Sequence, residues 1–450
     1  MNNQDTLTHV KSNIRRVALT SLAGTSIEWY DFFLYGVAAA LVFPAAFFPE
    51  NTPTMGLILS FGTFAFGFIA RPVGGILFGH FGDRIGRKRT LILALMLMGV
   101  ASTLIGLLPT YASIGIVAPV LLVVLRFAQG LAIGGQWGGA MLLVTESAPA
   151  DKRGYYGAYA QAGAPVGVIL ANLAFILIGL AISDEAFLEW GWRIPFILSV
   201  ALIGISMYVQ LHLEETEAFQ ELEALQSNAL HNAEAVQEAT AFHERSPIFK
   251  ALVKYPKTIT LAAGAFLSIQ VSFYILIAFA LAYGSDPDGA NIPRTTMLAA
   301  VLTAATLQIP TQFMAAAYSD RKGRRGIFML GAILSGVWAF ALFPLIDTGN
   351  FVLIVLGITG GLAFLGMMYG PQAAFYTELF STEVRYSGAS LGYQIGAIVG
   401  GAFAPAIATV LWTEYSIVWV SVYIALASVA SLVCVWMLTE TSGKSLHHND

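Results

Sequence analysis

The sequence predicts an all-α membrane protein in which twelve transmembrane helices form two pseudo-symmetric six-helix bundles. Three observations predict this fold class: the composition, the number of long apolar runs, and a set of landmarks that occurs twice. Of the 450 residues, 57% are hydrophobic and 11% are charged, whereas soluble domains carry about 25% charged residues. A chain this apolar is expected in a lipid bilayer rather than in water.

Twelve apolar runs are long enough to cross a hydrocarbon core of about 30 Å, which needs roughly 20 helical residues. No short apolar core with a small-residue cleavage site precedes the first run, so the N-terminus is expected to be a retained tail. The expected spans are 17–48, 54–80, 90–109, 114–147, 155–182, 192–213, 255–283, 294–318, 327–346, 351–380, 387–412 and 416–438.

A polar stretch rich in Ala and Glu separates the sixth run from the seventh. Its composition favours a soluble, helix-prone linker over a further span. The expected organisation has five parts: an N-terminal tail (1–16), a first bundle (17–213), a linker (214–254), a second bundle (255–438) and a C-terminal tail (439–450).

Two unrelated landmarks occur in both halves, in the same order. The pattern D-R-x-G-R begins at Asp83 and again at Asp320, 237 positions later, and a Glu followed seven residues later by Arg begins at Glu146 and at Glu378. Such recurrence predicts a duplicated chain with halves of similar length.

Basic residues are distributed unevenly between the predicted loops. With the N-terminus inside and twelve spans, 19 of the 23 Lys and Arg residues fall on the inner side. By the positive-inside rule, both termini are expected in the cytoplasm.

Four further motifs occur along the chain: IEWYDFFLYG (27–36), ARPVGG (70–75), RFAQGLAIGGQWGGA (126–140) and WGWRIPF (190–196). Together with the repeated D-R-x-G-R turn, they resemble the metabolite:proton symporter branch of the major facilitator superfamily, whose members take up organic acids and osmolytes. The resemblance covers nearly the whole chain. It implies the major facilitator fold, alternating access to a central site and, among the substrates of that branch, shikimate and related hydroxylated acids.

The repeated turns are expected to form a cytoplasmic gate, because a carboxylate there can meet a helix N-terminus or a cation across the boundary between the halves. The alternative is that the basic residues have no role in a gate and lie there only because of the positive-inside rule. The expected gate residues are Asp83, Arg84, Arg87, Glu146, Arg153, Asp320, Arg321, Arg324, Glu378 and Arg385.

Four ionisable residues fall at membrane depth: Glu28, Asp31, Arg71 and Arg126. A charge at the bilayer centre costs at least about 2.5 kcal/mol, so each is expected to face a cavity and find a partner. Glu28 and Asp31 are candidate proton carriers. Arg126 could pair with an acid in the empty site and with a substrate carboxylate in the loaded site, which would link proton and anion binding. The alternative is a permanent ion pair that holds helices together.

Further substrate-binding candidates follow from helical spacing and from the resemblance. Gln136 stands where related symporters usually carry Glu, which shifts the expected proton coupling to Glu28 and Asp31. In the second half, neutral amides and hydroxyls are expected to bind substrate, or else to join helices. Pro310, Pro371 and Pro405 are expected to break their helices. The full set is Arg126, Arg71, Tyr35, Gln129, Gln136, Trp137, Gln270, Tyr369 and Gln372.

The expected function is proton-coupled import of a small organic anion, such as shikimate or a related hydroxy or dicarboxylic acid, across a bacterial inner membrane. Three alternatives remain open: uptake of a zwitterionic osmolyte, proton-driven export, and metabolite sensing through the linker. No enzyme activity, cofactor, metal site or nucleic-acid partner is expected, since no Cys/His cluster, phosphate loop or nucleophile with a base occurs. The expected partners are the anion, a proton and the lipid bilayer, and the protein is expected to be monomeric.

Overall fold

The structure is a computed structural model that describes residues 3–85, 87–134, 137–211, 247–381 and 384–443. Within these ranges, the side chains of residues 3–13, 79–85, 87–91, 137–140, 143, 202, 206–211 and 247–249 are outside the description.

Twelve helical spans make up the structure, as predicted. Nine helices in the described part are long and apolar enough to cross a membrane, and α10 forms a tenth span, which is bent by 50° from the preceding segment Asp184–Gly191. The other two are α1, which has 39 residues, and α4 with its apolar segment Ile92–Leu107. The spans are α1 (Asn3–Leu41), α3 (Pro53–Ile85), α4 (Arg87–Leu107), α6 (Val117–Gly134) with α7 (Trp137–Ser147), α8 (Arg153–Ala181), α10 (Arg193–Leu211), α14 (Pro256–Tyr274) with η3 (Ile275–Phe279) and α15 (Ala280–Ser285), α16 (Arg294–Lys322), α17 (Arg324–Asp347), α18 (Phe351–Glu378), α19 (Arg385–Ala397) with η4 (Ile398–Ala402) and α20 (Ala404–Glu414), and α21 (Ile417–Met437).

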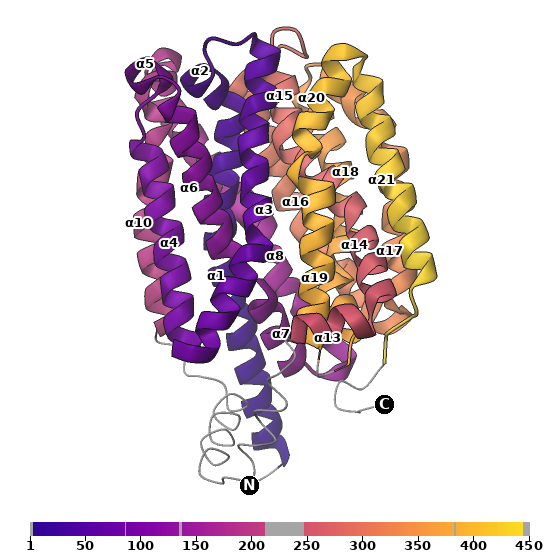
Figure 1. Ribbon diagram of the computed structural model, residues 1–450. Helices are drawn as coiled ribbons and strands as arrows, with labels where there is room; N and C mark the ends of the chain where they lie inside the picture. Colours follow the sequence, from indigo (N-terminus) through magenta and orange to yellow (C-terminus); the bar gives the residue numbers. More distant parts are fainter. Residues whose placement is uncertain (1–2, 86, 135–136, 212–246, 382–383, 444–450) are drawn as a thin grey trace.

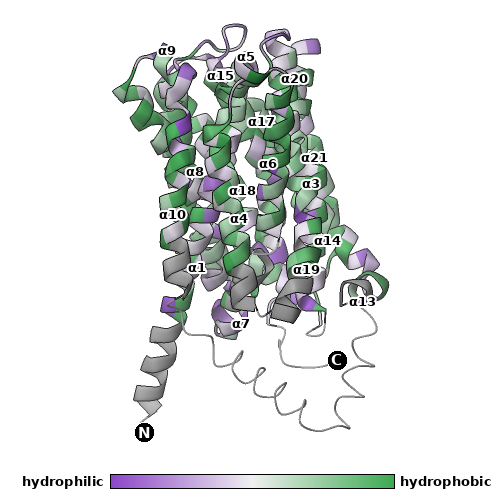
Figure 2. Ribbon diagram, turned by 60° about the vertical axis from the view of Figure 1, so that its left-hand side comes forward, coloured by the Kyte–Doolittle hydropathy of each residue, from purple (hydrophilic) through white to green (hydrophobic). Residues whose placement is uncertain are grey.

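Short elements connect the spans at both ends of the bundle. Most lie at the end opposite to the chain termini, where α5, α9 and α15 are seen in Figure 2. They are α2 (Phe43–Phe47), α5 (Tyr111–Ile114), η1 (Ala150–Lys152), α9 (Asp184–Ala186), η2 (Phe187–Gly191) and α13 (Pro247–Lys254).

The duplication seen in the sequence is present in the packing. In the first half α1 packs on α8, α3 on α6 and α4 on α10, and in the second half the equivalent pairs are α14 with α19, α16 with α18 and α17 with α21. The halves meet along a seam in which α8 packs on α16 and α18, and α3 packs on η4 and α20. Figure 1 shows the two halves side by side, coloured indigo to magenta and salmon to yellow.

The outer surface of the bundle is apolar where lipid tails are expected. Side chains such as Leu180, Met314 and Val352 are at least 70% exposed, and green ribbon covers the middle of the bundle in Figure 2 while purple gathers toward its ends. Large exposed apolar surface of this extent is unfavourable in water and favourable in a bilayer. The chain is therefore a multi-pass membrane protein.

Two of the three predicted proline breaks are wrong. Pro310 and Pro371 lie inside the continuous helices α16 and α18, whereas Pro405 is the second residue of α20, after the π-helical turn η4. A proline in a membrane helix removes one backbone hydrogen bond, and close packing against neighbouring helices is enough to hold the rest. The second half instead has π-helical turns at η3 in its first span and η4 in its fifth, and both turns contact the first half.

The predicted linker is helical where the structure describes it. Its last eight residues form α13, which packs against α19 and α14, and residues 214–246 lie outside the described residues. The end of the bundle at which α1 begins and α21 ends, with α7 and α13 beside them in Figure 1, is called the termini face below.

Candidate functional site

Arg126 lies at the centre of the first half because α6 packs closely against α3. Glycines permit this approach: a Cβ at Gly67 of α3 would lie 2.6 Å from Nε of Arg126. Its side chain is completely buried, and its guanidinium carbon lies 4.1 Å, 4.2 Å and 4.7 Å from the ring centroids of Phe32, Tyr35 and Phe64. Ring faces stabilise a cation, but they do not satisfy its N–H groups.

The hydrogen-bonding capacity of Arg126 is largely unused. Its Nη1 donates to Oε1 of Gln129 at 3.0 Å, while Nε and Nη2 are buried and have no hydrogen-bond partner among the described residues. A buried donor left in this way costs roughly 1–3 kcal/mol, and more when it is charged. Nε and Nη2 of Arg126 therefore mark a place where an acceptor is expected to bind.

Arg71 of α3 is a second buried cation with the same property. Its guanidinium carbon lies 4.4 Å from the ring centroids of both Phe32 and Phe68, and its Nε and Nη2 also lack a partner in the described part of the chain. Because the Phe32 centroid is 4.4 Å from Arg71 and 4.1 Å from Arg126, the two guanidinium carbons are at most 8.5 Å apart. One small molecule could contact both.

The second half brings hydroxyl groups to the same region. Tyr274, the last residue of α14 before η3, packs at 5.1 Å on the ring of Phe68 across the seam and interacts with Arg71. Tyr369 of α18 and Tyr393 of α19 interact with each other through their side chains, and both lie within the field of Arg71. The seam therefore carries two cations from the first half and three tyrosine hydroxyls from the second.

Buried amides extend this polar surface along the seam. Gln161 of α8 donates through Nε2 to the carbonyl of Tyr369 at 3.3 Å and to Oε1 of Gln372 at 3.2 Å. Nε2 of Gln372, Nε2 of Gln270 and Oε1 of Gln161 are buried without a hydrogen-bond partner in the described chain. The two Nε2 groups can donate to a ligand hydroxyl, and Oε1 of Gln161 can accept from one.

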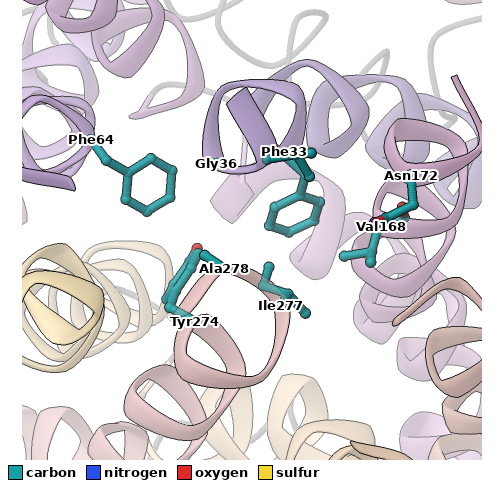
Figure 3. A pocket seen from close by; sticks show the side chains of 9 residues that line it. Phe33, Gly36, Phe64, Val168, Asn172, Tyr274, Ile277 and Ala278 are labelled. Atoms are coloured by element: carbon teal, nitrogen blue, oxygen red, sulfur yellow. The ribbon is translucent and has the colours of Figure 1, made fainter. Parts of the chain in front are cut away.

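A small cavity lies beside this group of residues. It is about the size of one water molecule and is lined by α1, α3, α8, α14 and η3. Figure 3 shows the rings of Phe33, Phe64 and Tyr274 around the opening, with Asn172 of α8 at its margin. A larger ligand at this place therefore requires the surrounding helices to move apart.

The two predicted acids have different surroundings. Asp31 is 1% exposed, and its Oδ2 accepts a hydrogen bond from Ser102 of α4, which in turn accepts one from Gln129 at 2.6 Å. Asp31 and Arg126 are thus connected through Gln129 and Ser102, and no direct ion pair between them is found. Glu28 lies one helical turn nearer the termini face, is half-buried, and forms no ion pair within the described chain.

The other predicted site residues fall into three groups. Arg71, Arg126, Tyr369, Gln372 and Gln270 are buried, and the first four of these are connected along the seam by the contacts above. Tyr35 donates to Oγ1 of Thr63 at 2.7 Å, so its hydroxyl is already paired. Gln136 and the side chain of Trp137 lie outside the described residues.

Sequence reasoning does not identify Ser102 and Gln161. Ser102 is one of several serines in apolar runs, and nothing in its sequence context sets it apart. Gln161 is a lone amide in a segment of small residues on α8, which is a weak signal for a buried polar contact. Both are completely buried and both donate or accept across helices.

A charged network closes the termini face across the seam. Asp320 at the end of α16 accepts from the backbone N–H groups of Gly154 and Tyr155, at 2.8 Å each, and so caps the N-terminus of α8 in the other half. Glu146 of α7 pairs with Arg385 of α19 at 3.3 Å, again across the seam. A carboxylate at a helix N-terminus is stabilised by the helix dipole and by charge-assisted hydrogen bonds.

The network continues within the second half. Arg324 pairs with Asp320 at 2.6 Å and with Glu378 at 3.1 Å, and Thr441 donates to Glu378 at 2.7 Å. Of the other predicted gate residues, Arg321 is exposed and Arg153 is buried. The side chains of Asp83, Arg84 and Arg87 lie outside the described residues.

Glu440 holds the chain after α21 against the start of α17. Its carboxylate accepts from the backbone N–H groups of Arg324 at 2.8 Å and Arg325 at 3.0 Å. Partial burial acts to raise the pKa of Glu440, but the backbone donors outweigh it and the pKa is lowered. Gly323 has a φ of +100°, and a Cβ there would meet Oε2 of Glu440 at 2.8 Å, so this turn requires glycine.

The opposite end of the bundle carries its own contact across the seam. Arg294 at the start of α16 pairs with Asp184 of α9 at 2.5 Å, and its guanidinium carbon lies 3.9 Å from the ring centroid of Phe187. Helices α8 and α16 are therefore joined near both of their ends, and the central cavity lies between the two closures.

Replacing Asp320 by Asn is expected to loosen the termini face. Asn offers one acceptor oxygen to the two N–H groups of α8 and no charge to Arg324, a loss of roughly 1–3 kcal/mol. The reporter is a thiol introduced by Thr377→Cys on α18, in a chain whose own thiol is removed by Cys434→Ser. Position 377 lines a small cavity between α7, α18 and α19. We expect thiol labelling at this position to accelerate about tenfold or more. The control is Asp347→Asn at the opposite end, which accepts from Tyr283 within the same half, and equal labelling rates in both variants would exclude Asp320 from the closure.

Comparison with known proteins agrees with this architecture. The family model described as sugar (and other) transporter matches residues 17–450. The inner membrane metabolite transport protein YhjE of Escherichia coli (strain K12) is 39% identical over 437 residues, which cover 96% of this chain and 95% of that protein. The shikimate transporter of the same organism is 40% identical over 423 residues, 92% of each chain. In fold, the chain is similar to the proton:xylose symporter XylE bound to 6-bromo-6-deoxy-D-glucose, with a TM-score of 0.73, 17% identity, and coverage of 97% of this chain and 98% of that one.

Two pseudo-symmetric six-helix bundles around a buried polar site define a membrane transporter of the major facilitator superfamily, not an enzyme. The chain belongs to the sugar (and other) transporter family within it. The fold class and the family expected from the sequence are thereby confirmed.

Proposed function

We propose that the protein imports a small hydroxylated organic anion together with a proton, and that shikimate represents the substrate class. The observation that carries this proposal is the pair of buried guanidinium groups, Arg71 and Arg126, whose Nε and Nη2 atoms have no partner in the described chain. Each guanidinium presents a fork that matches a carboxylate.

An anion is favoured over a neutral sugar because of the local charge. Two cations lie within 8.5 Å of each other against one fully buried carboxylate, Asp31. A neutral ligand would leave both guanidinium groups without a directly paired carboxylate in a low-dielectric interior, which is costly. A carboxylate bound between Arg71 and Arg126 removes that cost.

The hydroxyl-binding part of the proposal rests on the second half. Tyr274, Tyr369 and Tyr393 gather near Arg71, and Nε2 of Gln270 and Nε2 of Gln372, which have no partner in the described chain, belong to the same half. A ring carrying several hydroxyl groups would pair with these neutral donors and acceptors. The shikimate transporter of Escherichia coli, at 40% identity, supports this choice.

A zwitterionic osmolyte fits the site less well. Recognition of a quaternary ammonium needs free aromatic faces, whereas the rings of Phe32, Phe68 and Tyr35 are already covered by the two guanidinium groups. An ammonium group would also be repelled by both cations.

Proton coupling is proposed from the balance of deep charges. Glu28 and Asp31, when ionised, balance Arg71 and Arg126. A substrate carboxylate adds one negative charge, and uptake of one proton by Asp31 or Glu28 restores neutrality. The protein can then change the side to which its site opens, both with and without substrate, without burying a net charge.

The remaining expectations belong to the same proposal. Basic residues on the termini face support a cytoplasmic location for both termini in a bacterial inner membrane, as does the inner membrane relative YhjE. We propose a linker at 214–254 between bundles 17–213 and 255–438, tails at 1–16 and 439–450, and a monomer as the working unit.

Uptake into proteoliposomes tests the proposal. We expect labelled shikimate to accumulate above its external concentration when the outside is acidic, and accumulation to stop when a protonophore removes the gradient. Glycine betaine in the same assay tests the osmolyte alternative, and a reversed gradient tests export. Shikimate binding without counterflow would favour a sensor and contradict transport.

A further inference from the structure

We propose that Ser102 and Gln129 are positioning residues that link substrate binding at Arg126 to protonation of Asp31. The inference rests on the proposed proton-coupled transport and names the residues through which coupling passes. The four residues Arg126, Gln129, Ser102 and Asp31 are called the relay.

The relay crosses three helices in an unbroken series of hydrogen bonds. Nη1 of Arg126 donates to Oε1 of Gln129 at 3.0 Å, Nε2 of Gln129 donates to Oγ of Ser102 at 2.6 Å, and Oγ of Ser102 donates to Oδ2 of Asp31. None of the four side chains is more than 1% exposed. Water therefore does not compete for these bonds in the closed protein.

Every donor in the relay points from Arg126 toward Asp31. Hydrogen bonds in one direction polarise one another, so the positive charge of Arg126 strengthens the final bond to the Asp31 carboxylate. This arrangement suits an ionised Asp31. A protonated Asp31 needs no donor at Oδ2, and Ser102 can then turn its hydroxyl elsewhere.

Substrate binding acts on the other end of the relay. A carboxylate that engages Nε and Nη2 of Arg126, the two atoms without partners, draws the guanidinium away from Gln129 and offsets its charge. The donation from Ser102 then weakens, and Asp31 gains affinity for a proton. By linkage, a protonated Asp31 must raise the affinity of Arg126 for the anion by the same factor.

Few other groups near Asp31 could connect substrate binding to its protonation. The charged or titratable groups near it in the described chain are Arg126 on α6 and, on its own helix, Glu28 and Tyr30. Helices α4 and α10 present the hydroxyls of Ser102 and Ser199. Among the described residues, Asp31 forms hydrogen bonds and charge interactions only with the first half, so a substrate at the seam reaches it through Arg126 and the relay.

Binding of shikimate to the purified full-length protein at pH 6 and pH 8 tests the inference. For the wild type, the dissociation constant is expected to be at least about fivefold lower at pH 6, the lower range of common coupling factors. In Ser102→Ala the ratio is expected to fall close to one, and Ser102→Thr, which keeps the hydroxyl, should restore most of it. Gln129→Leu should act like Ser102→Ala.

The controls separate coupling from stability. Ser60→Ala removes another fully buried hydroxyl of the first half, one that donates to the carbonyl of Ala39, and should keep the wild-type ratio. The ratio is taken within each variant, so reduced stability alone does not change it. In an Asp31→Asn background, Ser102→Ala should have no further effect on the ratio, because the two changes act on one step.

The outcomes distinguish the inference from the proposed function. If the wild type shows the pH ratio and Ser102→Ala keeps it, the relay is wrong and proton coupling stands. If the wild type binds shikimate equally at both pH values, or does not bind it, both proposals fail.

Discussion

Replacing Arg126 by Lys is expected to weaken shikimate binding and uptake by about thirtyfold to several thousandfold, the range for losing one partner of a buried charge pair (roughly 2–5 kcal/mol). Lys keeps the positive charge but has no planar fork, so it cannot hold a carboxylate through two parallel bonds. It also cannot use Nε and Nη2, the two atoms of Arg126 that have no partner. The measurements are the dissociation constant of the purified protein and the initial uptake rate at subsaturating shikimate.

Arg71→Lys serves as the second arm of this experiment, and Arg193→Lys as its control. Arg193 donates to the backbone carbonyls of Gly106 at 3.0 Å and Leu108 at 2.5 Å, so it closes the end of α4 and does not face the seam. A comparable loss in Arg71→Lys would place the anion between both cations. If Arg126→Lys binds shikimate as tightly as the parent, Arg126 does not hold the anion.

The fold was predictable because each membrane-spanning helix is formed by one continuous apolar segment of the sequence. A run of about twenty mostly apolar residues without a charge, such as α21, has few alternatives to a span. The repeated D-R-x-G-R turn marked the duplication without any structure. The predicted breaks at Pro310 and Pro371 were wrong because a local rule about proline takes no account of the neighbouring helices that keep α16 and α18 continuous.

The sequence predicted some residues of the candidate site and missed others, for different physical reasons. Arg71 and Arg126 could be found because a charge at membrane depth needs an explanation. The register between helices is not encoded locally, so the sequence could not show that Gln129 turns toward Ser102 rather than toward the seam. The same holds for Gln161, whose partner Gln372 is 211 positions away.

Replacing Asp31 by Asn is expected to abolish accumulation of shikimate against its gradient. Asn cannot take up a proton in the working pH range, so the charge of an arriving anion is no longer balanced at this position. We expect the steady-state ratio of internal to external shikimate under an inward proton gradient to fall to about one, while a residual exchange of labelled for unlabelled shikimate persists. That split between accumulation and exchange identifies a coupling residue, because a variant that is merely unfolded loses both.

Glu28→Gln decides whether one acid or two carry protons. Glu28 is half-buried and has no ion-pair partner in the described chain, whereas Asp31 is held by Ser102 at the end of the relay. If Asp31 alone couples, Glu28→Gln should retain most of the accumulation ratio, and if both couple, it should lose about as much as Asp31→Asn. Accumulation as steep as that of the parent in Glu28→Gln with Asp31→Asn would remove both carboxyl groups from the mechanism. The proton would then have to travel with the substrate itself, since no other acid of the described chain is buried near the seam at this depth.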